Sequence, residues 1–245
     1  MKCLILAAGY ATRLYPLTEN FPKPLLKVKD KTILDWLVDD IDKSNQVDEY
    51  VVISNHKFVN HFNEWAKGKN QKITVIDDGT VSNETRLGAV KDIQFAIDKL
   101  FLSDDLLVIA GDNLLDFSLV KFIEYSKSKN TSCVFRYFEP SIKKLQKAGV
   151  IVCDENDKIL EMAEKPQEPK SNWACPPFYY YTKEDANLVK KGIESGCGTD
   201  APGSYIAWLC TQTTVHAMEM PGDRYDIGDI ISYEQVQNIF NGIIK

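Results

Sequence analysis

Two stretches near the N-terminus decide the fold: LILAAGYATRLYPLT at residues 4–18 and PKPLL at residues 22–26. An apolar run that ends in small residues predicts a buried strand followed by a tight loop. The N–H groups of such a loop can face an anion, and small side chains let a polyphosphate approach closely. An arginine grips phosphate oxygens with two parallel hydrogen bonds, and a lysine supplies a point charge. This pattern predicts a polyphosphate site that contains Leu6, Ala7, Ala8, Gly9, Arg13 and Lys23.

Outward from this stretch, apolar runs alternate with helical patterns. Such alternation predicts βαβ units and a mostly parallel, Rossmann-like sheet sandwiched by helices, which is an α/β fold. After residue 130 the pattern changes to shorter strands, some of which we expect to be antiparallel. We expect strands at 2–8, 50–54, 73–77, 106–110, 133–138, 150–153, 158–162, 178–181 and 214–219, and helices at 33–44, 58–66, 88–100, 119–127, around 183–195 and from 232.

The composition limits the class of protein. The 245 residues are 44% hydrophobic, which suits one large domain with ample core. The net charge of −6 disfavours a nucleic-acid surface, which needs a basic footprint. Six cysteines without a C-x-x-C pair favour reduced thiols and a cytoplasmic location, and no apolar run approaches the length of a membrane span. A homo-oligomer stays open.

A second motif is LLVIAGDN at residues 106–113. An apolar strand that ends in Gly-Asp places the Asp112 carboxylate at the carboxyl edge of a parallel sheet, where ligands bind. A hard oxygen ligand there suits Mg²⁺, which typically binds phosphates plus one or two carboxylates. Asp112 is therefore a candidate metal and nucleotide ligand.

These motifs resemble the signature of the nucleotidyltransferases that make nucleotide sugars and related activated alcohols. The family pattern is roughly L-A-A/G-G-x-G-T-R-L-x-P-L-T followed by P-K-P-L-L. The resemblance implies that RYDIGD, at residues 224–229, corresponds to the family's W-x-D-x-G-T element, with Asp226 as the second metal ligand. This sequence departs from the pattern at Ala11, where the family has its second Gly, and at Asp229, where the family has Thr.

A further match lies in the second half, in GVI at 149–151, EMAEKP at 161–166 and EPKSNWA at 168–174. It resembles the G-V-V, E-K-P and P-K-S-N-Y-A elements of enzymes that activate hexose 1-phosphates. The resemblance implies that Gly149 and Glu164 bind sugar hydroxyls and that Lys165 contacts the sugar phosphate. It also implies a base-reading loop within residues 77–88, which includes Gly88. We expect one domain over residues 1–245, with a nucleotide-binding half at 1–130 and an acceptor-binding half at 131–235 that carries a small sugar-side lobe.

The function implied is nucleotidyl transfer from an NTP, with dTTP or UTP favoured, to a sugar 1-phosphate, assisted by Mg²⁺, Arg13 and Lys23. One alternative is a CTP-dependent cytidylyltransferase for phosphocholine or a related phospho-alcohol. Its cationic head group would need aromatic faces, and the candidates are Trp173, Phe178, Tyr179 and Tyr180, for which core packing is the competing role. A second alternative is a non-catalytic sugar-nucleotide sensor. The base and the acceptor stay open, because Ala11 and the Pro176-Pro177 region depart from the family pattern.

Overall fold

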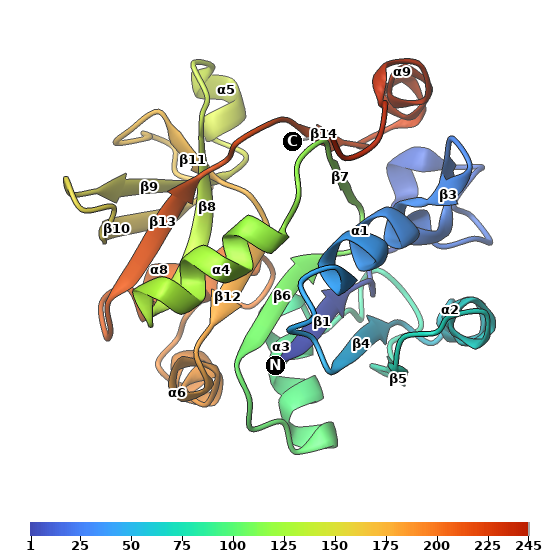
Figure 1. Cartoon of the computed structure of the whole chain (residues 1–245), viewed down its shortest axis with the longest axis horizontal. Helices are drawn as coiled ribbons and strands as arrows, with labels where there is room; N and C mark the ends of the chain where they lie inside the picture. Colours follow the sequence, from blue (N-terminus) through green and yellow to red (C-terminus); the bar gives the residue numbers. More distant parts are fainter. Residues whose placement is uncertain (245) are drawn as a thin grey trace. The chain divides into compact units, whose positions relative to one another are not determined.

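The computed structural model describes residues 1–244, which fold into two compact units (Figure 1). The first unit comprises residues 1–86, 109–121 and 221 onward; the second comprises residues 87–108 and 122–220. The fold is of the mixed α/β class that the sequence predicts, with strands flanked by helices. The units are interleaved in sequence, whereas the expected division near residue 130 concerns function and stays a prediction.

The first unit is built on three parallel strands, in the order β1, β4, β5. Their side chains are apolar because both faces are covered, and Cys3, Leu4 and Ile5 of β1 are completely buried. Helix α2 packs against β4 and β5. The elements of this unit before residue 86 are β1 (Lys2–Leu6), η1 (Thr12–Leu14), η2 (Lys23–Leu25), β2 (Lys27–Val28), β3 (Lys31–Thr32), α1 (Ile33–Asp42), β4 (Glu49–Ser54), α2 (Val59–Lys67) and β5 (Ile73–Asp77).

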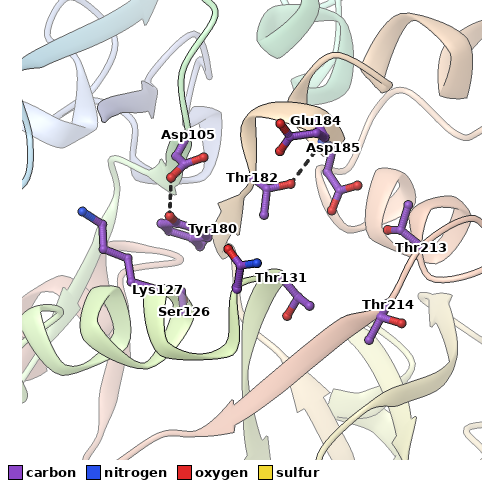
Figure 2. A pocket seen from close by; sticks show the side chains of 11 residues that line it. Asp105, Ser126, Lys127, Thr131, Tyr180, Thr182, Glu184, Asp185, Thr213 and Thr214 are labelled. Atoms are coloured by element: carbon purple, nitrogen blue, oxygen red, sulfur yellow. Dashed lines mark hydrogen bonds between the residues drawn. The ribbon is translucent and has the colours of Figure 1, made fainter.

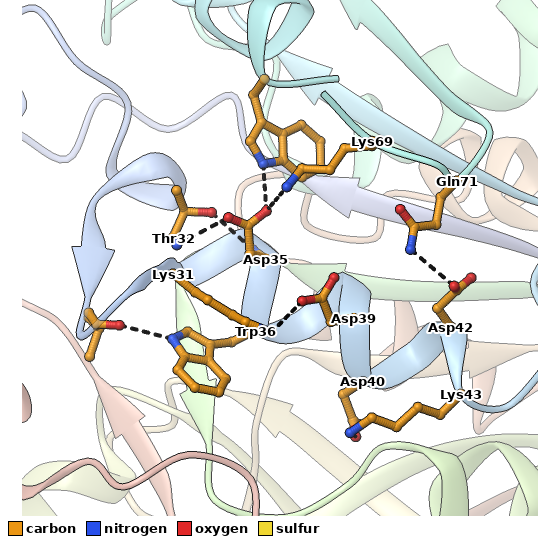
Figure 3. Close-up of polar contacts among 12 residues, drawn as sticks. Lys31, Thr32, Asp35, Trp36, Asp39, Asp40, Asp42, Lys43, Lys69 and Gln71 are labelled. Atoms are coloured by element: carbon orange, nitrogen blue, oxygen red, sulfur yellow. Dashed lines mark hydrogen bonds and ion pairs between the residues drawn. The ribbon is translucent and has the colours of Figure 1, made fainter. Parts of the chain in front are cut away.

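Helix α1 is fixed at its N-terminus by side-chain hydrogen bonds, which Figure 3 shows. The Thr32 hydroxyl accepts the backbone N–H of Asp35 at 3.0 Å, and the Asp35 carboxylate accepts the backbone N–H of Thr32 at 3.2 Å. Such a capping box satisfies two backbone donors that the first turn leaves open. Further along, Asp40 is buried and accepts the backbone N–H of Leu119 at 2.7 Å. The polar residues of α1 therefore hold the scaffold of this unit together.

The C-terminal segment completes the first unit. Strand β7 (Asn113–Leu115) pairs with β14 (Arg224–Asp226) in an antiparallel ladder, and α9 (Ile230–Ile239) follows. A buried apolar cluster joins side chains from both ends of the chain. Its members are Leu14, Leu26, Val28, Ile33, Leu114, Ile227, Val236 and Phe240.

The second unit is largely antiparallel. Strand β8 pairs with β11 and β12 in antiparallel register and with β13 in parallel register, and β9 lies between β10 and β11. Helix α3 packs against α7, and α8 packs against β10. The elements are α3 (Ala89–Leu100), β8 (Ser132–Phe138), α5 (Ile142–Leu145), β9 (Gly149–Cys153), β10 (Ile159–Glu164), β11 (Trp173–Cys175), β12 (Phe178–Tyr181), α6 (Lys183–Ala186), α7 (Val189–Glu194), α8 (Gly203–Leu209) and β13 (Val215–Glu219), while β6 (Leu106–Ala110) and α4 (Val120–Lys129) each begin in one unit and end in the other.

Most of the expected strands and helices are confirmed within a few residues. The helix expected around 183–195 is instead two short helices, α6 and α7. The break has a local cause, because the carbonyl of Asp185 accepts the Tyr205 hydroxyl and the backbone N–H of Leu188. Among the helices of residues 1–244, none combines the length and the apolar character that a membrane span requires.

Candidate active site

The loop after β1 has free backbone donors. The N–H of Ala7 donates to Ile53 at 2.9 Å, and the Asn55 amide donates to the Ala8 carbonyl at 3.0 Å. Beyond these anchors, the N–H groups of residues 8–12 find no acceptor among residues 1–244. Consecutive free N–H groups in a tight loop can bind an anion. Leu6, Ala7 and Ala8 therefore fix the loop, and Gly9, which is exposed, lies in its open part.

Ala11 lies in this loop with a left-handed backbone, at φ 45° and ψ 42°. An L-residue with a Cβ atom pays roughly 1–2 kcal/mol for this conformation. The carbonyl of Ala11 accepts the buried Thr18 hydroxyl at 2.8 Å and the backbone N–H of Leu14 at 2.9 Å. The departure from Gly at this position therefore leaves a left-handed loop that its neighbours hold in place.

Lys23 and Asp112, which are far apart in sequence, form an ion pair with Nζ to Oδ2 at 2.8 Å. The Lys23 side chain is 7% exposed and the Asp112 side chain is 41% exposed. Gly111, which precedes Asp112, lies close to β1, because a Cβ atom there would be 2.9 Å from the Ile5 side chain. The first two sequence motifs therefore meet at the carboxyl end of β6, inside the first unit.

The other carboxylate oxygen of Asp112 accepts the Asn113 amide at 2.8 Å, and the Asn113 amide oxygen accepts Arg224 at 2.6 Å. Partial burial opposes ionisation of Asp112, but the charges of Lys23 and, behind it, Arg224 outweigh this effect and lower the pKa of the carboxyl. Asp112 is thus held as a carboxylate by a chain of contacts that runs from Lys23 to Arg224.

Arg13 lies against the third motif. Its guanidinium nitrogens are 3.8 and 3.9 Å from where a Cβ atom of Gly228 would stand. Hydrogen bonds from Ser232 lower the pKa of Asp229, and the charge of Arg13 contributes. Asp226 is exposed and lies opposite Asn113 in the β14–β7 ladder, one residue from Asp112. The first unit therefore contains all four predicted residues: Lys23 and Asp112 are in direct contact, Arg13 lies beside Gly228, and Asp226 pairs with the residue after Asp112.

The carboxylates of this unit suit a hard divalent cation whose remaining ligands come from the substrate and water. Asp112 and Asp226 supply carboxylate oxygens, and Mg²⁺ usually takes one or two carboxylates together with phosphates and water. Within residues 1–244 no three His, Cys, Asp or Glu side chains gather to hold a metal by themselves. Such a site would therefore be completed by substrate oxygens.

In the second unit, Glu164 is the centre of the candidate acceptor site. It pairs with Gly149 in the β10–β9 ladder. A Cβ atom on Gly149 would lie 2.7 Å from Met162 and 3.3 Å from the Glu164 carboxylate, and one on Gly203 would overlap that carboxylate, so a side chain at either glycine would push Glu164 from its position. Glu164 makes no hydrogen bond or ion pair with any side chain of residues 1–244. Burial raises the pKa of Glu164, Lys165 opposes this, and Asp200 adds to it.

Lys165 has an unusual backbone. Its φ is 50°, and it precedes Pro166, which disfavours helical conformations in the residue before it. The backbone N–H of Lys165 donates to Ala148 at 3.0 Å, while the side chain is exposed. Sparsely populated backbone conformations cluster at functional sites. The turn directs an exposed cation next to the Glu164 carboxylate.

Gly88 lies in the second unit with φ 92°, and a Cβ atom there would lie 2.5 Å from the carbonyl oxygen of Thr199. The two N–H groups that follow donate to the carbonyls of Thr199 and Asp200, each at 3.1 Å. Gly88 therefore permits a close contact between two loops. Its expected role in nucleotide binding stays a prediction.

The aromatic candidates for a phosphocholine site pack into the second unit. Phe178, Tyr179 and Tyr180 are at most 3% exposed, and the Tyr180 hydroxyl donates to Asp105 at 2.6 Å. Trp173 lies under the Arg136 guanidinium, 4.7 Å from the ring centre. The competing role, core packing, is confirmed for the three buried rings.

Several residues that shape the site were missed from the sequence. Asn55 fixes the anion loop, Asn113 and Arg224 orient Asp112, and Gly203 makes room for Glu164. A polar residue directly after an apolar strand is a usable signal for Asn55 and Asn113. Arg224 and Gly203 had no such signal, because their partners are distant in sequence.

Comparisons with known proteins identify the family of this chain. A family model described as nucleotidyl transferase matches residues 2–241, and the chain therefore belongs to the nucleotidyl transferase family. The chain is 31% identical over 230 residues to the bifunctional protein GlmU of Methanococcus aeolicus, a match that covers 93% of this chain and 51% of that protein. It is 24% identical over 256 residues to the UTP–glucose-1-phosphate uridylyltransferase of Synechocystis, covering 100% of this chain and 65% of that protein.

The chain spans about half the length of the GlmU proteins it matches. Among solved structures, it is similar to a UDP-glucose pyrophosphorylase complexed with UDP-glucose, with a TM-score of 0.80 and 22% identity over 97% of both chains. At this identity the likeness establishes the fold.

Proposed function

We propose that this chain transfers a nucleotidyl group from an NTP, with dTTP or UTP favoured, to a sugar 1-phosphate. An oxygen of the sugar phosphate attacks the α-phosphorus, a new P–O bond forms, and the bond to the β-phosphate oxygen breaks to release pyrophosphate. The nucleophile is already anionic, so the reaction needs no general base. Of the relatives described above, one is named as a uridylyltransferase that acts on UTP and glucose 1-phosphate. The other is named as the bifunctional protein GlmU.

The observation that carries the proposal is the ion pair of Lys23 with Asp112, extended through Asn113 to Arg224. It joins three separate sequence motifs beside a loop with free N–H donors. In the proposed reaction the loop binds the phosphates, and Arg13 and Lys23 stabilise the charge that develops on the α-phosphate and on the leaving pyrophosphate.

Asp112 and Asp226 would hold Mg²⁺, which would neutralise phosphate charge and orient the triphosphate. A cation on Asp112 would compete with the Lys23 ammonium, which could then contact a phosphate oxygen. Glu164 and Gly149 would accept and donate hydrogen bonds with the sugar hydroxyls, and Lys165 would contact the acceptor phosphate. A cytoplasmic location remains part of the proposal.

Pyrophosphate release tests the function directly. Purified protein is incubated with Mg²⁺ and each pairing of the common NTPs with glucose 1-phosphate, mannose 1-phosphate, N-acetylglucosamine 1-phosphate and phosphocholine. We expect release with a sugar 1-phosphate, its loss with EDTA and its return with Mg²⁺. Asp112→Asn should weaken both the rate and the Mg²⁺ dependence, because a neutral amide is a poorer ligand for a hard cation.

The alternatives give different results in the same assay. Release with CTP and phosphocholine would identify a cytidylyltransferase, although the buried aromatic rings do not favour it. No release with any pairing, together with measurable binding of a nucleotide sugar, would identify a sensor. Full activity in EDTA would contradict the metal assignment.

A further inference from the structure

The second unit contains a polar cavity that the proposed reaction does not use. Its volume is about 420 Å³, which is within the range of small-molecule sites. Figure 2 shows the eleven residues that line it. They are Asp105, Ser126, Lys127, Asn130, Thr131, Tyr180, Thr182, Glu184, Asp185, Thr213 and Thr214.

Asp185 is the main charged group in this cavity. Its residue is 5% exposed, and its Oδ2 atom accepts the Ser132 hydroxyl at 2.5 Å. The second carboxylate oxygen, Oδ1, accepts no hydrogen bond from residues 1–244. This oxygen keeps some contact with solvent and is therefore accessible to a small ligand. Asp185 therefore supplies a strong acceptor toward the cavity.

Thr213 supplies the second observation. Its hydroxyl oxygen is buried and has no hydrogen-bond partner among the described residues. Figure 2 shows the Thr213 hydroxyl and the Asp185 carboxylate on facing sides of the cavity. Buried polar atoms are almost always paired, so an orphan beside a cavity indicates a missing ligand or water.

The charges of the lining select the ligand. Asp105, Glu184 and Asp185 are acidic, and Lys127 is basic. Three carboxylates repel phosphates and carboxylic acids and attract a cation. The surrounding threonine hydroxyls donate and accept hydrogen bonds, which suits hydroxyl groups on the ligand. We propose that this cavity is a binding site for a small hydroxylated amine, with its ammonium on Asp185 and a hydroxyl on Thr213.

This cavity is separate from the candidate acceptor site. Thr131 precedes β8, and β11 pairs with the far end of β8, where Ala174 lies opposite Tyr137, six residues after Thr131. Six residues of a strand span about 20 Å. Gly149, beside Glu164, pairs with Cys175. A ligand in the cavity therefore does not occupy the place proposed for the sugar, and the inference does not rest on the proposed reaction.

Isothermal titration with a matched pair of probes tests the site. Glucamine (1-amino-1-deoxysorbitol) carries an ammonium group, and sorbitol has a hydroxyl in its place. We expect the Kd of glucamine to be lower than that of sorbitol by about tenfold or more, as for a hydrogen bond to a charged group. Asp185→Asn should remove this preference, and Thr213→Val, which keeps the shape, should raise the Kd of glucamine about fivefold.

Two control variants sharpen the test. Glu194→Gln removes an exposed charge of the same unit outside the cavity and should leave the Kd of glucamine unchanged. Glu164→Ala should also leave it unchanged, because that residue belongs to the acceptor site. Equal binding of the two probes, no binding of either, or wild-type affinity in the folded Thr213→Val variant would each overturn the proposal. Loss of binding in Glu164→Ala alone would place the amine in the acceptor site and would also overturn it.

Discussion

Lys23 and Lys165 both precede a proline, yet their surroundings differ. Lys23 is buried in the first unit and paired with Asp112 at 2.8 Å. Lys165 is exposed in the second unit, in a left-handed turn, and its ammonium has no acceptor among the described residues. In the first unit Lys23 and Asp112 neutralise each other, whereas in the second unit Glu164 and Lys165 form no hydrogen bond or ion pair through their side chains among the described residues.

The two regions differ in the contacts that a ligand would have to replace. In the proposed reaction, a triphosphate and its metal would replace the ion pair of Lys23 with Asp112. An acceptor meets a carboxylate and an ammonium that are already free to bind it. Lys23 and Asp112 are therefore satisfied without a ligand, whereas the partly buried Glu164 carboxylate carries an electrostatic cost that a bound acceptor would reduce.

The largest expected effect comes from removing the cations of the first unit. Lys23→Ala and Arg13→Ala should each lower kcat/KM by roughly 10²-fold or more, because each removes a charge that stabilises the transition state. Steady-state pyrophosphate release measures this. Lys27→Ala, which removes an exposed lysine nearby, should stay close to wild type. Near-normal turnover of both folded variants would show that the cations are structural only.

The next effect addresses the acceptor half. Glu164→Ala should raise the KM for the sugar phosphate by about 10- to 100-fold, because hydrogen bonds to a charged group are lost. The KM for the NTP should change little, since this residue lies in the second unit. Kinetics with each substrate varied in turn measure both values. An equal rise in the two KM values would contradict a separate acceptor site.

A smaller effect tests the contacts behind Asp112. Asn113→Leu keeps the side-chain volume but removes the bridge to Arg224. We expect divalent-metal affinity to fall about tenfold, as when an outer-shell partner of a metal ligand is removed. Electron paramagnetic resonance of Mn²⁺ measures binding without turnover. Asn241→Leu, in the C-terminal segment, serves as the control, and an unchanged Mn²⁺ affinity in Asn113→Leu would exclude the bridge as an orienting element.

The free energy of unfolding should rise when the left-handed backbone strain at Ala11 is removed. Ala11→Gly should stabilise the protein by about 0.5–1 kcal/mol, because the left-handed backbone favours glycine and the gain exceeds the added freedom of the unfolded chain. Urea unfolding measures it. Ala66→Gly, inside α2, should instead destabilise by about 1 kcal/mol. Destabilisation by both would mean that Ala11 carries no strain.

The smallest effect tests the electrostatic cost in the second unit. Burial raises the pKa of Glu164 above its ordinary 4.5, against the effect of Lys165, so the folded state binds this proton more tightly than the unfolded state. Protonated Glu164 contributes its full share to the free energy of unfolding when the pH is below the pKa of the unfolded state. This contribution is lost as the pH rises through the higher pKa of the folded state. Glu164→Gln should therefore have a slightly higher Tm than wild type at neutral pH, and the difference should shrink toward zero below pH 4.5. The control variant Glu168→Gln, on an exposed loop, should show no such trend. If the Tm of Glu164→Gln followed the same pH profile as that of wild type, the Glu164 carboxylate would carry no electrostatic cost.

Local patterns foretold much of the scaffold. The apolar runs of β1, β4, β5 and β6 and the amphipathic helices α1 and α3 are determined largely by neighbours in sequence, and all are confirmed. The pieces missed are short elements whose partners are distant. Strand β7 exists because β14 pairs with it across more than 100 residues of sequence, and no local pattern signals that contact.

The candidate site divides in the same way. Residue types and order made Arg13, Lys23 and Asp112 candidates, and the family resemblance added Asp226 and Glu164. What they could not reveal was how these charges are paired. The ion pair of Lys23 with Asp112 and the isolation of Glu164 between Gly149 and Gly203 depend on the register and packing of strands, which only the folded chain provides.

The cluster that joins the two ends of the chain has a consequence for biosynthesis. Leu14, Leu26 and Ile33 leave the ribosome early, but Ile227, Val236 and Phe240, which complete their packing, are translated after the entire second unit. Nascent chains expose unburied apolar surface for as long as its partner segment is missing. The first unit, although translated first, can close only after the second unit has been synthesised, and chaperones that bind apolar segments have access to it throughout that interval.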